Sequence, residues 1–163
     1  MPVEIDVPDR SAALELGRRL ASLLQSGDLV LLSGPLGAGK TTLTQGIGAG
    51  LGVRGPITSP TFVIARVHPS LVGGPGLVHV DAYRLGGALE LDDLDLDAAV
   101  AASVTVIEWG EGKGEQLAAD RLVVRIDRHL GAADDERTVT VHATGARWEG
   151  IDLSAQLLPA TST

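Results

Sequence analysis

Residues 28–41 read DLVLLSGPLGAGKT, an apolar run that passes directly into a glycine-rich loop. The apolar part, Asp28 to Ser33, is typical of a parallel strand that is covered on both faces. The loop from Gly34 to Thr41 has the spacing G-x-x-x-x-G-K-T, and a helix is predicted from about Thr41 to Leu51. This strand, loop and helix together predict an α/β fold of the P-loop NTPase kind.

The loop has the chemistry of a phosphate site. Small residues let several backbone N–H groups point at one phosphate group, and the helix that follows adds its positive end. The Lys40 ammonium is expected to reach the β- and γ-phosphates, and the Thr41 hydroxyl is expected to bind Mg²⁺. The predicted nucleotide-binding residues of the loop and the first helical turn are Leu36, Gly37, Ala38, Gly39, Lys40, Thr41 and Thr42.

Alternating strands and helices are predicted along the rest of the chain, as in an α/β sandwich. Helices are expected over Ser11 to Ser26 and Leu89 to Ala102, and the expected strands are Val3 to Val7, Phe62 to His68, Leu77 to Asp81, Val104 to Glu108, Leu122 to Asp127 and Thr138 to Thr144. The second and third of these strands are joined by a Gly/Pro-rich loop that indicates a hairpin. We therefore expect a three-layer sandwich around a central, mostly parallel sheet. Residues 1–156 would form one domain, and 157–163 a flexible tail.

Two apolar strands end in an acid: Leu77 to Asp81 reads LVHVD, and Val104 to Glu108 reads VTVIE. If both strands run parallel to the strand before the loop, their carboxylates reach the sheet edge where ligands bind in open α/β sheets. Asp81 and Glu108 are therefore the candidate acids for the metal site, with Lys40 as the third candidate catalytic residue. The other interpretation of each acid is an ordinary strand-end cap.

Composition limits the partners. The 163 residues carry 13 Lys and Arg against 21 Asp and Glu, a formal net charge of −8, which argues against broad binding to DNA or RNA backbones. Absence of cysteine excludes disulfides and thiol nucleophiles. No segment approaches the roughly 18 apolar residues of a membrane span, so a soluble cytoplasmic protein without a membrane partner is expected.

Several residues near the candidate acids have two open interpretations. Thr58 to Phe62 reads TSPTF, which is either a hydroxyl-bearing segment that senses the γ-phosphate or a polar turn. His79 is either a metal ligand together with Asp81 or a hydrogen-bonded strand histidine. Arg84 is either a cation for the transition state or a plain ion-pair partner.

The chain resembles the bacterial TsaE proteins, a family of small P-loop ATPases. The resemblance rests on LGAGKT at Leu36 to Thr41, SPTF at Ser59 to Phe62, HVDAYRL at His79 to Leu85 and IEW at Ile107 to Trp109. These pieces occur in the family's order and spacing, and the resemblance extends from about Ser11 to Thr144. One departure is Pro35, where the family usually has an acidic residue.

The resemblance implies ATP hydrolysis with Mg²⁺ in the making of threonylcarbamoyladenosine next to the anticodon of tRNA. TsaE acts with the TsaB–TsaD pair, so tRNA would be met through that complex. By motif match, Thr41 and Glu108 would ligate Mg²⁺, and Asp81 would organise metal or water. Ser11 would approach the adenine, Thr61 would take the switch-like position, and Trp109 would border the site.

Two other functions use the same scaffold. A small-molecule kinase needs an Arg-bearing lid, and the segment Gly86 to Ala102 has acids but no Arg or Lys. A nucleotide-gated binding module without turnover is the third candidate.

Overall fold

The computed structural model describes residues 2–34, 39–55, 57, 65–81, 101–108, 120–128 and 137–157, except for the side chains of Asp81 and Arg128. The elements in chain order are β1 (Val3–Val7), α1 (Arg10–Leu23), β2 (Leu29–Ser33), α2 (Lys40–Leu51), β3 (Ala65–His68), β4 (Gly76–Asp81), β5 (Ser103–Glu108), β6 (Arg121–Arg128), β7 (Arg137–Thr144), the 3-10 turn η3 (Ala146–Trp148) and α4 (Leu153–Leu157). No helix within these ranges is long and apolar enough to cross a membrane.

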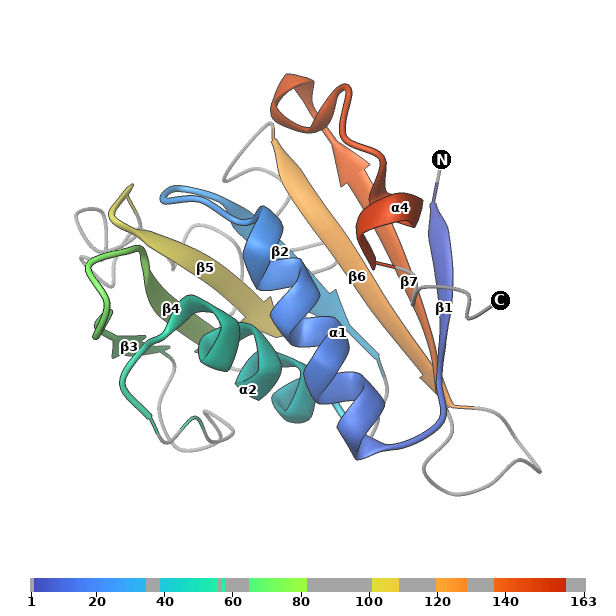
Figure 1. Ribbon diagram of the computed structural model, residues 1–163, viewed down its shortest axis with the longest axis horizontal. Coiled ribbons are helices and arrows are strands. Elements are labelled where there is room, and N and C mark those ends of the chain that lie inside the picture. The colour runs from blue at the N-terminus through green and yellow to red at the C-terminus, as the bar shows by residue number, and fades with distance from the viewer. Residues whose placement is uncertain are drawn as a thin grey trace.

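The strands form one seven-stranded sheet in the order β1-β7-β6-β2-β5-β4-β3 (Figure 1). Its centre is parallel, since β2 pairs in parallel with both β5 and β6, and β5 pairs in parallel with β4. The outer strands are antiparallel to their neighbours. This arrangement confirms the predicted α/β fold with a central parallel sheet, and it adds antiparallel edges on both sides.

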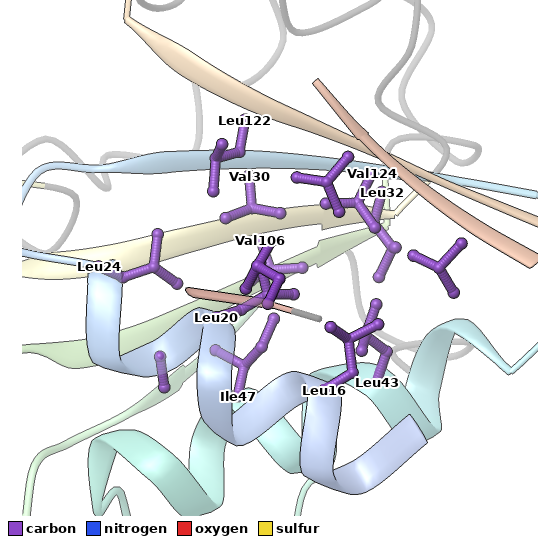
Figure 2. Packing of buried hydrophobic residues seen from close by; sticks show 14 of the residues in the cluster. Leu16, Leu20, Leu24, Val30, Leu32, Leu43, Ile47, Val106, Leu122 and Val124 are labelled. Carbon is purple, nitrogen blue, oxygen red and sulfur yellow. The ribbon is translucent and has the colours of Figure 1, made fainter. Parts of the chain in front are cut away.

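The apolar core lies between the sheet and the helices α1 and α2, which lie side by side on one face (Figure 1). Figure 2 shows Leu16 and Leu20 of α1 and Ile47 of α2 packed against strand residues such as Val30 and Val106. Because side chains alternate along a strand, Leu31 and Ile107 point to the opposite face, and each is 0% exposed. Both faces of the central strands are therefore shielded from water, as the apolar run at residues 28–33 predicts. The helix predicted over residues 89–102 lies almost wholly outside the described residues.

Helix α1 begins at Arg10, one residue before the predicted start, and ends at Leu23, three residues before the predicted end. Asp9 caps it by accepting a hydrogen bond from the Ala12 amide at 2.8 Å. We expected the helix to continue to Ser26, and this was wrong, because Leu24 has extended backbone angles. The Asp28 carboxylate accepts the amide hydrogen of Gln25 at 2.7 Å, so this side chain satisfies the chain just beyond the helix.

The two helices approach closely at a pair of glycines. A Cβ atom at Gly17 of α1 would lie 2.6 Å from the carbonyl oxygen of Leu43 in α2. A Cβ atom at Gly46 would collide in the same way with the carbonyl oxygen of Leu14. Only glycine allows this backbone contact, so it places α2, and with it Lys40, firmly against α1.

The predicted hairpin is confirmed, since β3 and β4 pair antiparallel with Arg66 opposite His79. Residues 62–64 of the longer predicted strand lie outside the described residues. At the other end of the chain, we expected the flexible tail to begin at Leu157, and this was wrong for that residue, which is the last residue of α4. Leu157 is 1% exposed because it packs in α4, and its carbonyl accepts a hydrogen bond from Arg19 Nη1 at 3.3 Å. Residues 158–163 lie outside the described residues.

Candidate functional site

Strands β2, β4 and β5 are parallel and end at one edge of the sheet, which brings the candidate acids to the glycine-rich loop. Glu108 at the end of β5 has Leu32 of β2 as its Cα partner on one side and Asp81 of β4 on the other. The expected meeting of both acids with the loop at this edge is therefore confirmed for their backbone positions. The side chain of Asp81 is outside what the structure describes.

Lys40 is the first residue of α2 and follows a glycine that the backbone requires. Gly39 has φ of +103°, a left-handed conformation that favours glycine. Lys40 is 7% exposed, and its Nζ donates a hydrogen bond to the carbonyl oxygen of Gly34 at 2.8 Å. The ammonium therefore bends back over the start of the loop, where the sequence predicts a phosphate. Three predicted nucleotide-binding residues, Leu36, Gly37 and Ala38, lie outside the described residues.

Thr41 and Glu108 face each other across the gap between α2 and β5. The Thr41 hydroxyl donates to Glu108 Oε1 over 3.4 Å, and Glu108 is 4% exposed. No Lys or Arg among the described residues forms a salt bridge with Glu108. A buried carboxylate is costly unless a cation or a hydrogen-bond donor compensates it, and the Thr41 hydroxyl beside Glu108 supplies a second oxygen that can ligate a metal. Hard oxygen donors of this kind fit Mg²⁺, so the two residues predicted to hold the metal do lie together.

His79 also belongs to this cluster, through a contact with Glu108 that the sequence did not predict. It is 0% exposed, and its Nε2 lies 3.3 Å from Oε2 of Glu108. Neither ring nitrogen has a hydrogen-bond partner within the described ranges. The two interpretations of His79, a metal ligand together with Asp81 and a hydrogen-bonded strand histidine, stay predictions. The contact with Glu108 requires β4 and β5 to be neighbours, and the only sequence signal for it was the shared strand face of His79 and Asp81. No group of three or more His, Cys, Asp or Glu side chains in the described ranges is arranged to hold a metal.

The N-terminus of α1 lies beside the first turn of α2. Arg10 donates to the Thr42 hydroxyl from Nη1 at 3.4 Å and to Oε1 of Gln45 from Nη2 at 3.1 Å. The exposed Ser11, predicted to approach the adenine, therefore adjoins a residue that contacts the predicted nucleotide-binding Thr42. Sequence reasoning missed Arg10, because nothing in the pattern indicates which residue of α1 reaches α2.

Gln45 also connects α2 to the chain that leads into the predicted switch segment. Its Nε2 donates to the carbonyl oxygen of Ile57 at 2.8 Å. Thr61 in that segment lies outside the described residues, as does Trp109 after β5.

The family model described as "Threonylcarbamoyl adenosine biosynthesis protein TsaE" matches residues 7–139 of this chain. A Streptomyces coelicolor protein named tRNA threonylcarbamoyladenosine biosynthesis protein TsaE is 68% identical over 142 residues, which cover 86% of this chain and 96% of that protein. The Bacillus subtilis protein of the same name is 38% identical over 143 residues, which cover 87% of this chain and 85% of that protein.

Among solved structures, the crystal structure of Bacillus subtilis YdiB matches with a TM-score of 0.71 at 31% identity. The match covers 91% of this chain and 90% of the YdiB chain. The family model, the relatives and the solved structure agree, and the chain belongs to the TsaE family of threonylcarbamoyl adenosine biosynthesis proteins.

Proposed function

We propose that this protein binds and hydrolyses ATP with Mg²⁺, and that it does so for the threonylcarbamoyl modification of the adenosine next to the anticodon in tRNA. The observation that carries the ATPase proposal is the contact of 3.4 Å between Thr41 and the buried Glu108, beside Lys40 at the start of α2. The modification is supported by the family match and by the names of the relatives in Streptomyces coelicolor and Bacillus subtilis.

The proposal assigns a role to each predicted site residue. Lys40 binds the β- and γ-phosphates as a point charge, and the N-terminus of α2 adds its partial positive charge. The Thr41 hydroxyl and the Glu108 carboxylate hold Mg²⁺, which when bound neutralises charge on the phosphate oxygens. Asp81 organises the metal or the attacking water, as its position at the same sheet edge allows. Ser11 approaches the adenine, Thr61 senses the γ-phosphate, and Trp109 borders the site.

The acidic net charge of the chain argues against extensive direct binding of tRNA by this protein. With a formal net charge of −8, the protein is poorly suited to bind a phosphate backbone over a wide surface. We propose that the TsaB–TsaD complex holds the tRNA and that this protein acts on that complex in the cytoplasm. A low rate of hydrolysis by the protein alone is expected, because a P-loop ATPase can depend on a partner for its transition-state cation.

The test is ATP hydrolysis by the protein alone, with TsaB–TsaD, and with TsaB–TsaD and tRNA. Lys40→Ala is expected to lower the stimulated rate by roughly 100-fold or more, because a charge at the reacting phosphates is lost. Arg18→Ala is the matched control, since Arg18 is an exposed cation on α1, paired with Glu15 at 3.4 Å. Unchanged turnover in Lys40→Ala would overturn the assignment. A phosphorylated metabolite in place of free phosphate would identify a kinase.

The metal is tested separately from turnover. Glu108→Gln removes the charge that we assign to Mg²⁺, so it should weaken nucleotide binding in the presence of Mg²⁺ and leave binding in EDTA unchanged. Glu15→Gln, on the exposed face of α1, is the control substitution. If the wild type bound nucleotide equally well with and without Mg²⁺, the metal site proposed at Thr41 and Glu108 would be wrong.

A further inference from the structure

His79 is a buried histidine beside Glu108 of the candidate site. It is on β4, opposite Val106 of β5 and two pairs away from the Asp81–Glu108 pair. The imidazole is 0% exposed, and both of its nitrogens lack a hydrogen-bond partner within the described ranges. Leaving a buried polar group unpaired is unfavourable, so such a group in a folded protein calls for an explanation.

One oxygen of the Glu108 carboxylate lies close to the His79 ring. His79 Nε2 lies 3.3 Å from Oε2, whereas the Thr41 hydroxyl contacts Oε1 at 3.4 Å. The two oxygens of the carboxylate are therefore divided between two neighbours. The His79 contact is longer than the usual 2.9 to 3.0 Å of a formed N–H···O bond, but contacts in a site without its ligand commonly tighten when the ligand binds.

We propose that His79 is a positioning residue for Glu108, which it orients through a hydrogen bond from Nε2–H to Oε2. With Oε2 held in this way, Oε1 stays directed at the Thr41 hydroxyl and at the Mg²⁺ that both residues are proposed to bind. This inference rests on the proposed function of the site. Groups that hold a metal ligand in place typically change metal affinity by about 10- to 100-fold when they are removed.

The buried position also explains why a histidine suits this task. A glutamate side chain has three rotatable bonds, and restricting them before the metal arrives lowers the entropy lost on binding. The rigid ring is fixed by the strand and by its packing, and it donates from its far nitrogen. A side chain whose N–H donor reaches as far as Nε2 should therefore be able to take over the role of His79. A side chain with a shorter reach should not.

The experiment uses three variants of the full chain. His79→Leu removes the donor and keeps an apolar side chain of similar size, His79→Gln places an amide N–H near the position of Nε2, and His79→Asn places it nearer to Nδ1. Two binding readouts avoid dependence on turnover: calorimetric titration with ADP in Mg²⁺ and in EDTA, and Mn²⁺ binding followed by electron paramagnetic resonance.

We expect the variants to lose affinity for the metal ion and to keep their affinity for metal-free ADP. His79→Leu and His79→Asn should weaken Mg²⁺-dependent ADP binding and Mn²⁺ binding by about tenfold or more. The His79→Gln variant should keep most of the wild-type affinity. ADP affinity in EDTA should stay within about twofold of the wild type in all three variants, because the phosphate contacts are untouched. In a Glu108→Gln background, His79→Leu should have little further effect on Mn²⁺ binding.

His68 provides the matched control. It is another buried histidine, on the neighbouring strand β3, with Leu77 as its Cα partner, and its Nδ1 lies 3.0 Å from the carbonyl oxygen of Arg54. His68→Leu should change the thermal midpoint and leave the Mg²⁺ dependence of binding as it is.

The outcomes separate the two proposals. If the wild type binds no nucleotide, or binds it without Mg²⁺ dependence, the proposed function fails and the role of His79 fails with it. If the wild type is Mg²⁺-dependent and His79→Leu matches it, only the role of His79 is overturned. An equal loss of metal affinity in all three variants, including His79→Gln, would show that His79 only fills space in the core. That result would overturn the inference as well.

Discussion

The guanidinium of Arg147 lies against the carboxylate of Asp28, with Nη2 3.1 Å from Oδ2 and Nε 3.3 Å from Oδ1. Arg147 belongs to η3, and Asp28 immediately precedes β2. The same Nη2 donates to the carbonyl oxygen of Leu23 at 2.8 Å, and the guanidinium stacks 4.3 Å above the ring of Trp148. One side chain thus attaches the C-terminal part of the chain to the central strand and to the end of α1.

Removing this guanidinium should destabilise the protein. The Asp28 side chain is 9% exposed, so Arg147→Ala leaves a buried carboxylate without its cation and should lower the free energy of unfolding by about 2 kcal/mol. Urea unfolding measures the change. Arg125→Ala is the comparison, because Arg125 pairs with Asp127 at 3.3 Å where the two side chains are 60% and 46% exposed. That variant should change the free energy by less than about 0.5 kcal/mol, and equal losses in both would contradict the buried role of Asp28.

The contact between α1 and α2 should not tolerate a methyl group. Gly46→Ala adds a Cβ atom against the Leu14 backbone. An alanine in a helix is favoured over glycine by about 1 kcal/mol, yet forcing apart two packed backbones costs about 1 to 3 kcal/mol, so we expect a net loss of stability. Gly74→Ala is the control, since a Cβ atom there meets nothing within 4 Å. A Gly46→Ala protein as stable as the wild type in urea would show that the helices can separate freely.

Thr105 should be a site where the loss of a hydroxyl increases stability. It is 4% exposed in β5, and its Oγ1 has no hydrogen-bond partner within the described ranges. Thr105→Val keeps the shape and removes an unpaired polar atom, so the free energy of unfolding should rise by about 1 kcal/mol.

Thr44→Val is the matched comparison in α2. The Thr44 hydroxyl is buried but donates to the Lys40 carbonyl oxygen at 2.9 Å, so its removal should lower the free energy by up to about 1 kcal/mol. Thermal unfolding of the two valine variants should therefore show midpoints that move in opposite directions. A decrease for Thr105→Val would show that its hydroxyl is paired.

His68 should make stability depend on pH. Burial lowers the pKa of His68 below its ordinary value of 6.5, and nearby His79 and Arg66 lower it further, against the opposing contact with the Arg54 carbonyl. The folded state therefore binds fewer protons than the unfolded state when the pH falls below 6.5. The stability that neutral His68 contributes is present above that pH and is lost as the pH falls through the lowered pKa.

The measurement is the difference in unfolding free energy between about pH 7.5 and about pH 5. His68→Gln should lose less stability over this range than the wild type does. His142→Gln, at an exposed position on β7, should behave like the wild type. If all three proteins lost the same amount, the titration of His68 would not contribute to acid sensitivity.

Local patterns were sufficient to predict the central part of the fold. The apolar run at residues 28–33 and the glycine-rich loop predict β2, the start of α2 and the parallel sheet, because burial on both faces and phosphate geometry leave few alternatives. The acids that end β4 and β5 could be assigned to the same edge, because parallel strands bring their C-terminal residues to one edge of the sheet. Thr41 and Glu108 are in contact there, and the Lys40 ammonium contacts the carbonyl oxygen of Gly34 at the start of the loop.

Contacts between distant segments could not be predicted from those patterns. Pairing of β1 with β7 depends on which edges remain open after the parallel strands assemble, and no single strand records that. His79 beside Glu108 and Arg147 beside Asp28 depend on strand order and on the path of the C-terminal segment. Residues Leu36, Gly37, Ala38, Thr61 and Trp109 stay predictions, because they lie outside the described residues.

The pairing of β2 with β5 has a consequence for synthesis of the chain on the ribosome. Thr41 and Glu108 are 67 residues apart in sequence, so the lysine and threonine of the site emerge well before the carboxylate. At roughly 5 to 20 residues per second, the delay is about 3 to 13 s. During that interval the nascent chain has the loop for phosphate but lacks the strand that carries Glu108, and the complete site is a late product of translation.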